Sequence, residues 1–165
     1  AISDSPSDLD SLLDTVANNA AQLCEAKDAT IFQVDGDDLK LVAKFGPTQM
    51  WPKGRKKRIT RDWVTGRAVK DCKIIRLLDL QALEHEYPDG SAIAQKHGHR
   101  SVCIVPLIRE NAAIGAILIR RFEVNPITDK QLELLTAFAD QASIAIENVR
   151  LFNEINKKSL KLKEQ

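Results

Sequence analysis

The chain has 165 residues, of which 44% are hydrophobic and 28% are charged, a length and composition that fit one soluble domain with its own core. Its 24 basic and 23 acidic side chains leave a net charge of +1, which excludes recruitment of nucleic acid or an anionic membrane by an overall field. The three cysteines, Cys24, Cys72 and Cys103, are odd in number and far apart, which excludes a disulfide framework and favours reduced thiols in a cytoplasmic setting.

The start of the chain predicts a helix followed by a β-hairpin. Apolar residues recur at helical spacing from residue 7 to 26, which is typical of an amphipathic helix. Residues 29–34 are rich in β-branched and aromatic side chains, and residues 39–45 alternate apolar and polar side chains. Asp35-Gly36 between them indicates a tight turn, so we expect two antiparallel strands here.

The middle of the chain is less regular. Residues 46–58 predict a basic loop, and residues 60–71 predict a short helix broken near Gly66. Residues 73–80 predict a short apolar strand. A segment punctuated by proline and glycine follows, and within it we expect a helical turn or two over residues 91–97.

Two strongly apolar strands come next, over residues 100–108 and 112–122, joined by a polar turn. They are apolar on both faces, as expected for the middle of a sheet that is covered on both sides. Pro106 has no N–H to donate to a ladder, so we expect a bulge or an unpaired position there.

The last segment carries the clearest helix start in the chain. Thr128 and Gln131 have the spacing of a capping box, and Ile127 and Leu132 have that of a hydrophobic staple. No Pro or Gly follows for about 35 residues, which corresponds to roughly 50 Å of helix. One domain does not need that length to close its core. The end of the helix is therefore either a frayed tail or, as we favour, the start of a coiled coil that leads to an output domain.

This order of elements predicts an α+β fold in which terminal helices flank an antiparallel sheet of about five to six strands. We expect a single domain over residues 1–165, with its core at about 8–155 and residues 156–165 as the start of a helical linker. The chain begins at Ala1 without an initiator Met, a signal peptide or the roughly 20 apolar residues that span a bilayer. We therefore expect a segment of a longer protein that does not itself contact a membrane.

One short stretch could bind a metal. His97, His99 and Cys103 lie within seven positions, and imidazole and thiolate are the usual ligands of zinc. Cys103 lies inside an apolar run, however, where a small thiol behaves as a hydrophobic side chain, and no second ligand pair is evident. We therefore predict no metal and interpret the stretch as the boundary between a pocket rim and a central strand.

Other patterns that could carry chemistry are weak. Residues 53–58 contain five basic side chains and could contact phosphate, but only Trp51 is near to stack on a base and no nucleic-acid motif accompanies them. We interpret this run as a solvated loop. No nucleophile motif, glycine-rich phosphate loop or conspicuous carboxylate pair is present. The residues therefore predict neither a catalytic site nor a nucleic-acid partner.

Three stretches resemble a known family. "TGRAVKDCKIIRLLDL" (65–80), "RSVCIVPLIRENAAIGAILIRR" (100–121) and "PITDKQLELLTAFADQASIAIENVRLFNEI" (126–155) resemble the matching segments of GAF domains, above all those upstream of bacterial sensor histidine kinases and nucleotide cyclases. The resemblance covers about residues 8 to 155. It implies a GAF-like sheet with the N- and C-terminal helices on one face and a pocket on the other, under the segments 46–70 and 79–99.

The resemblance also implies a function. We expect a non-catalytic sensory domain of a two-component sensor histidine kinase, which binds a small ligand or mediates dimerisation and passes a signal through its C-terminal helix by population shift. The alternatives are the regulatory domain of a nucleotide cyclase and a GAF-fold enzyme similar to the free methionine sulfoxide reductases. Cys72 and Cys103 do not stand in the cysteine-rich strings of those reductases, so we expect no catalysis by this segment.

Departures from the family's patterns argue against its known cofactors. Relatives that bind cyclic nucleotides carry an N-K-x-F-x-x-x-D-E pattern, and here Asn125 and Lys130 are not followed by it. Relatives that bind bilins place a Cys-His pair shortly before the strand that here begins near Arg100, where this chain has no cysteine. We expect neither group, and we do not expect haem on a histidine of the same stretch. The ligand is left unidentified.

The candidate pocket residues share a polar or aromatic side chain, or a thiol, close to the expected pocket: Trp63, Arg76, Tyr87, His97, His99, Arg100 and Cys103. The candidate residues for dimerisation and signalling lie on the last helix: Phe138, Ala142, Ala145, Val149, Phe152 and Ile155. The expected partners are a small molecule, a second copy of the chain and a downstream catalytic domain.

Overall fold

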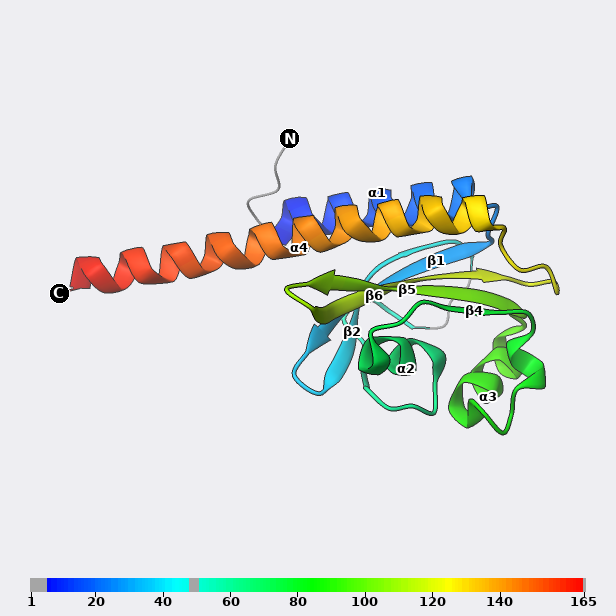
Figure 1. The fold of residues 1–165 in the computed structure, drawn as a ribbon. Helices are drawn as coiled ribbons and strands as arrows, with labels where there is room; N and C mark the ends of the chain where they lie inside the picture. Colours follow the sequence, from blue (N-terminus) through cyan, green and yellow to red (C-terminus); the bar gives the residue numbers. More distant parts are fainter. Residues whose placement is uncertain (1–5, 48–50, 165) are drawn as a thin grey trace.

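The computed structural model describes residues 6–47 and 51–164. In these ranges the chain forms a six-stranded antiparallel sheet with two long helices on one face and shorter helices on the other (Figure 1). The strands are β1 (Asp28–Asp35), β2 (Asp38–Phe45), β3 (Lys56–Arg58), β4 (Ile75–Leu77), β5 (Ser101–Arg109) and β6 (Ala112–Arg121). The helices are α1 (Pro6–Leu23), α2 (Val64–Asp71), the 3-10 turn η1 (Leu80–Ala82), α3 (Pro88–His97) and α4 (Asp129–Glu164). The predicted α+β class is confirmed.

The two predicted hairpins form the centre of the sheet. The strand order is β3-β2-β1-β6-β5-β4, so the hairpins meet through β1 and β6. Pro106 pairs with Ala116, and the register shift falls between Leu107 and Ile108, so the irregularity comes just after the predicted position. Pro106 is tolerated because β4 pairs only with residues 102–104 and leaves the rest of β5 without a neighbour on that side.

The middle of the chain is more regular than predicted. α2 runs through Gly66 without a break, because the missing Cβ lets the helix approach the Thr60 carbonyl oxygen and the Trp63 indole. The predicted basic loop ends in β3, an edge strand paired with β2. The expected strand over residues 73–80 shortens to the three residues of β4, and the expected turn at 91–97 is the second half of α3.

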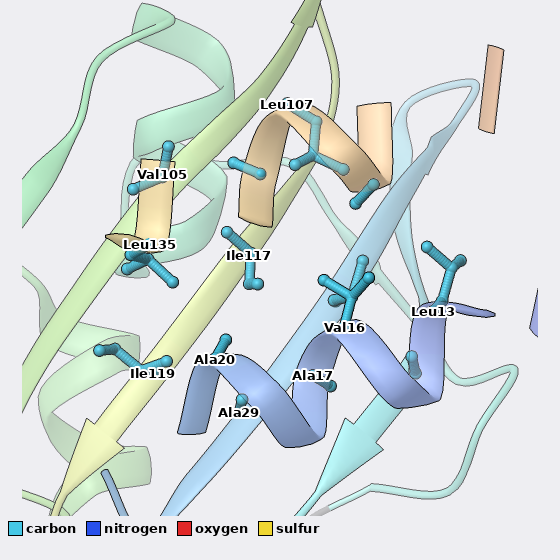
Figure 2. Packing of buried hydrophobic residues seen from close by; sticks show 14 of the residues in the cluster. Leu13, Val16, Ala17, Ala20, Ala29, Val105, Leu107, Ile117, Ile119 and Leu135 are labelled. Atoms are coloured by element: carbon cyan, nitrogen blue, oxygen red, sulfur yellow. The ribbon is translucent and has the colours of Figure 1, made fainter. Parts of the chain in front are cut away.

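The larger core lies between the sheet and the two long helices. α1 and α4 lie side by side across one face (Figure 1), and Leu13 and Val16 of α1 and Leu135 of α4 pack against Ile117 and its neighbours on the sheet (Figure 2). Each of these buried side chains contributes about 1.5–3 kcal/mol relative to an exposed position. This face of the sheet is therefore covered by the two long helices.

α4 begins with the predicted capping box. The Gln131 N–H donates to Thr128 Oγ1 at 3.1 Å, and the Thr128 N–H donates to Gln131 Oε1 at 2.9 Å. The helix then continues well past the sheet (Figure 1), where every side chain from residue 150 to 160 is exposed. None of the helices in the described ranges has the length and apolar character needed to cross a membrane.

The candidate dimer residues of α4 lie in two different environments. Phe138, Ala142, Ala145 and Val149 pack into the core of their own domain, and only Phe152 and Ile155 are exposed. The physical reason is that the apolar stripe of α4 packs against the sheet of its own chain. The same side chains are then buried and do not face a second copy.

Candidate ligand-binding site

The second core cluster lies on the opposite face of the sheet and contains a cavity. It joins the strands to α2, η1 and α3. The cavity measures about 40 Å³, and at about 10–15 Å³ per water this is room for roughly three water molecules. Its lining is mostly apolar: Phe32, Trp51, Trp63, Val64, Thr65, Leu80, Gly90, Ile93, His99, Val102, Ile104, Leu118 and Arg120. The resemblance implied a pocket under these same segments.

Three aromatic rings form one wall of the cavity. The ring centroids of Phe32 and Trp63 are 5.7 Å apart, and those of Trp51 lie 6.1 Å from Phe32 and 5.9 Å from Trp63, all edge to face. This is the geometry that aromatic pairs prefer. Trp63 Nε1 donates to the Arg58 carbonyl oxygen at 3.0 Å, which fixes that indole and ties β3 to α2.

The charged groups beside the cavity come from β1 and β6. The Arg120 side chain is buried; its Nη2 donates to Thr30 Oγ1 at 2.9 Å, and its Nε lies 3.4 Å from Asp28 Oδ1. A buried guanidinium requires such a partner, since desolvation of an isolated charge is costly. The Arg120–Asp28 ion pair places two opposite charges at this end of the cavity, and their sum is zero.

His99 is the most informative lining residue. Its side chain is 3% exposed, and Nδ1 is buried without a hydrogen-bond partner among the described residues. Burial, and secondly the positive charge of Arg120, lower the pKa of His99 to about 3, so the imidazole is neutral at physiological pH. Buried polar atoms are almost always hydrogen-bonded. His99 Nδ1 is therefore an exception among buried polar atoms, and it belongs to a residue that lines the cavity.

Of the seven predicted pocket residues, Trp63 and His99 line the cavity. Three others lie close to it without lining it. Tyr87 is buried under the Arg67 guanidinium, whose carbon is 4.1 Å from the ring centroid. His97 is the last residue of α3, and Arg100 pairs with a carboxylate on the approach to η1.

The other two predicted residues, Arg76 and Cys103, face the long helices. They are register partners on β4 and β5, while the neighbours of Cys103 on β5 face the cavity, because successive strand residues point to opposite faces. Arg76 pairs with Asp129 at the start of α4 at 2.8 Å. Burial raises the pKa of the Cys103 thiol to about 12. Neither residue lines the cavity.

Among the lining residues that the sequence did not predict, Phe32, Trp51 and Arg120 carry the aromatic and charged side chains. Phe32 belongs to a strand that is buried on both faces, so no periodicity assigns it to one face. Trp51 stands beside the basic run, where the sequence indicates at most stacking on a base. Arg120 did carry a signal, since alternation along β6 places it on the same face as Leu118, and a charge in an apolar strand indicates a buried polar site.

The basic run at 53–58 covers the aromatic wall instead of forming a free loop. Two of its cations lie over indole rings, Arg55 over Trp51 at 5.2 Å and Lys57 over Trp63 at 5.4 Å. The others have carboxylate partners: Lys53 with Asp14, Lys56 with Asp35 and Arg58 with Asp37, and Lys57 also reaches Asp89. These charges have partners within the domain, while residues 53–56 and 58 stay exposed, as expected for a solvated run.

The structure gathers no set of three His, Cys, Asp or Glu side chains in a metal-binding arrangement among the described residues. Cys24 and Cys103 are buried in the core under the long helices, and Cys72 is exposed at the end of α2. None of the three thiols lines the cavity.

Comparisons with known proteins agree with this architecture. A family model described as GAF domain matches residues 6–147. A comparison with curated proteins gives no match. Among solved structures, the chain is similar to residues 122 to 287 of a methyl-accepting chemotaxis protein, with 22% identity, a TM-score of 0.74 and coverage of 87% of this chain and 91% of that one.

Two further solved structures carry the same fold in other settings. One is the GAF domain of a phosphoenolpyruvate-protein phosphotransferase from Coxiella burnetii, with 16% identity, a TM-score of 0.76 and coverage of 88% and 86% of the two chains. The other is a type II free methionine-R-sulfoxide reductase from Thermoplasma acidophilum, with 15% identity, a TM-score of 0.70 and coverage of 86% and 94%. At these identities the likeness concerns the fold alone.

Proposed function

The chain belongs to the GAF domain family, and from that premise we propose that it is the non-catalytic sensory domain of a bacterial two-component sensor histidine kinase. The observation that carries the proposal is the cavity with the buried, unpartnered Nδ1 of His99. A small molecule that binds there shifts the domain between two states in proportion to its differential affinity for them. α4, which runs from the sheet into a free helical extension, passes this shift to a catalytic domain.

The state of the thiols supports a non-catalytic role. A thiol reductase needs a thiolate at its substrate pocket, whereas here the buried cysteines lie on the far side of the sheet and the exposed one lies outside the cavity. The same free thiols support a location in the cytoplasm, where cysteines are kept reduced.

We further propose that the domain acts as a homodimer through a stripe on α4 that its own core leaves uncovered. The stripe, here called the outer stripe, consists of exposed residues at alternating spacings of three and four: Leu134, Ala137, Gln141, Ile144, Asn148, Leu151 and Ile155. This spacing is typical of a two-stranded coiled coil. A second copy is the occupant that fits, because the stripe continues onto the helix extension beyond the sheet and a polar a-position such as Asn148 specifies a parallel pair in register.

Ligand binding is tested by thermal denaturation of the purified domain against a panel of metabolites, together with native mass spectrometry for a co-purified molecule. We expect a ligand to raise the Tm of the wild type and of His85→Phe, whose histidine is exposed, and not that of His99→Phe. A molecule that stabilises all three proteins equally, or the absence of any stabilising molecule, would contradict the sensory role.

The dimer is tested separately by sedimentation. We expect Ile144→Glu together with Leu151→Glu to give monomers. The matched control is Ile74→Glu, since Ile74 and Ile144 are both 46% exposed but Ile74 lies beside β4. Loss of the dimer in the control, or its persistence in the double variant, would rule out the outer stripe.

A further inference from the structure

The cavity is smaller than any ring-shaped ligand, so a side chain must move for one to enter. Its 40 Å³ hold about three waters, whereas ligand pockets commonly measure about 300–1,000 Å³. Displacement of most side chains of the aromatic wall would cost considerable free energy. Phe32 lies within the sheet at 1% exposure, and Trp63 is held at 4% exposure by its hydrogen bond to Arg58.

Trp51 is the most exposed ring of the aromatic wall. It lies outside the regular helices and strands, it is only partly buried, and its indole packs edge to face on Phe32 and Trp63. Its outer face is covered by the guanidinium of Arg55, which is itself exposed. If the indole swings outward, it leaves a flat slot bounded by two aromatic rings, which an edge-to-face ring would refill.

The charges around this slot select against ionised ligands. The Arg120–Asp28 pair is internally neutral, and an ionised group placed in this apolar lining would lose its hydration without a free counter-charge. A cation would be repelled further, because Arg55 and Lys57 already occupy the indole faces that could have formed an aromatic cage. An uncharged ring satisfies the apolar lining without this cost.

His99 supplies a polar anchor for such a ring. His99 Nδ1 has no partner among the described residues, and the neutral imidazole can accept or donate one hydrogen bond there according to its tautomer. A hydroxyl or a ring N–H is the kind of group that would bind it. A purely hydrocarbon ring would fill the slot but leave this nitrogen unpaired.

We propose that the cavity binds an uncharged planar compound of one or two rings with one hydrogen-bonding group, that His99 binds this group, and that the ring displaces the indole of Trp51. The inference rests on the proposed sensory function and names its ligand class. It also identifies Trp51 as the side chain that moves. Lys53, two residues after Trp51, pairs with Asp14 of α1 at 2.5 Å. Displacement of Trp51 would therefore loosen a contact on the opposite, helical side of the domain.

Calorimetric titration of the purified domain with four probes of similar size tests the ligand class: phenol, indole, benzoate and benzyltrimethylammonium. We expect phenol and indole to bind, and both ions to bind at least about tenfold more weakly. His99→Phe should weaken phenol binding about fivefold, the effect of one hydrogen bond worth about 1 kcal/mol, and should leave toluene binding unchanged. Preferential binding of either ion would overturn the ligand class while leaving the sensory role intact.

Displacement of Trp51 is tested by tryptophan fluorescence during the phenol titration. We expect a red shift in the wild type, as Trp51 moves into water, and none in Trp51→Phe. Trp51→Ala should bind indole about tenfold more tightly than the wild type, because no side chain has to be displaced. Phe45→Ala, which removes a ring from the helical side, should not change indole binding. Phenol binding without a red shift, or equal indole affinities in wild type and Trp51→Ala, would overturn the displacement.

Discussion

Arg120 and Arg121 are neighbours on β6 whose side chains emerge on opposite faces of the sheet, Arg120 beside the cavity and Arg121 beneath the start of α4. Arg121 Nη2 donates to the Cys24 carbonyl oxygen at 2.7 Å and to Gln131 Oε1 at 3.0 Å, and Nη1 donates to the Asn125 carbonyl oxygen at 2.9 Å. One strand end therefore connects the cavity, the end of α1 and the capping box of α4. A shift of β6 caused by a ligand would reach the output helix through a single peptide bond.

Replacement of Arg121 by Met should uncouple these elements. Because several acceptors lose a charged donor, we expect the free energy of unfolding to fall by about 2–4 kcal/mol, with faster hydrogen exchange in the first turn of α4. Chemical denaturation and hydrogen-exchange mass spectrometry measure the two effects. The control Arg150→Met removes an exposed arginine that pairs with Glu147 and Glu154 of its own helix. Equal losses in both variants would contradict the role of Arg121.

The buried imidazole of His99 should make the domain sensitive to acid. Its pKa is about 3 in the folded state and about 6.5 in the unfolded chain, so between these values the unfolded state binds the extra proton. The contribution of the neutral imidazole to the free energy of unfolding is then fully present above pH 6.5. It is lost as the pH falls, by about 2 kcal/mol between pH 7 and pH 5. Denaturation curves at several pH values measure the slope. His99→Phe should lose this part of the slope and His85→Phe should keep it.

Gly66 should tolerate no side chain. A Cβ there would overlap the Thr60 carbonyl oxygen and the Trp63 indole, so we expect Gly66→Ala to lower the free energy of unfolding by about 1–3 kcal/mol. Gly90 is a matched control in α3, where an added Cβ meets Tyr87 and Val64 at an ordinary 3.4 Å. Gly90→Ala should be neutral or stabilise by up to about 1 kcal/mol. Thermal denaturation of both variants checks the difference.

The three thiols should differ sharply in reactivity. Cys72 is exposed, whereas Cys24 and Cys103 are buried, and burial raises the pKa of both buried thiols. We expect a thiol reagent to label Cys72 alone in the native protein and all three in denaturant. Rapid native labelling of Cys103, read by mass spectrometry of peptides, would contradict its place under the helices.

Asn148 should set the geometry of the proposed dimer. Asn148→Ile replaces a polar residue of the outer stripe by an apolar one, so we expect a tighter association in sedimentation but less strict parallel pairing. Disulfide cross-linking through a cysteine placed at Ser159 reports the orientation. An unchanged association in Asn148→Ile would show that Asn148 lies outside the contact.

The sequence predicted the elements whose patterns are local. The capping box of Thr128 and Gln131 specified the start of α4, and alternating side chains specified the first hairpin, because hydrogen bonds and periodicity of this kind involve residues close in the chain. The resemblance of three stretches to GAF domains predicted the family. It also placed the pocket under the irregular segments, where Trp63 and His99 line the cavity.

Only the tertiary structure decided which face each side chain serves. Cys103 and its neighbours on β5 are all apolar, so no pattern shows that Cys103 meets the helices while Val102 and Ile104 meet the cavity. The same holds for α4, where a broad apolar stripe packs against the domain's own sheet and the narrower outer stripe stays exposed. The aromatic wall joins Phe32, Trp51 and Trp63 from three separate segments. Such contacts depend on how the sheet folds these segments together, and local periodicity carries no information about that.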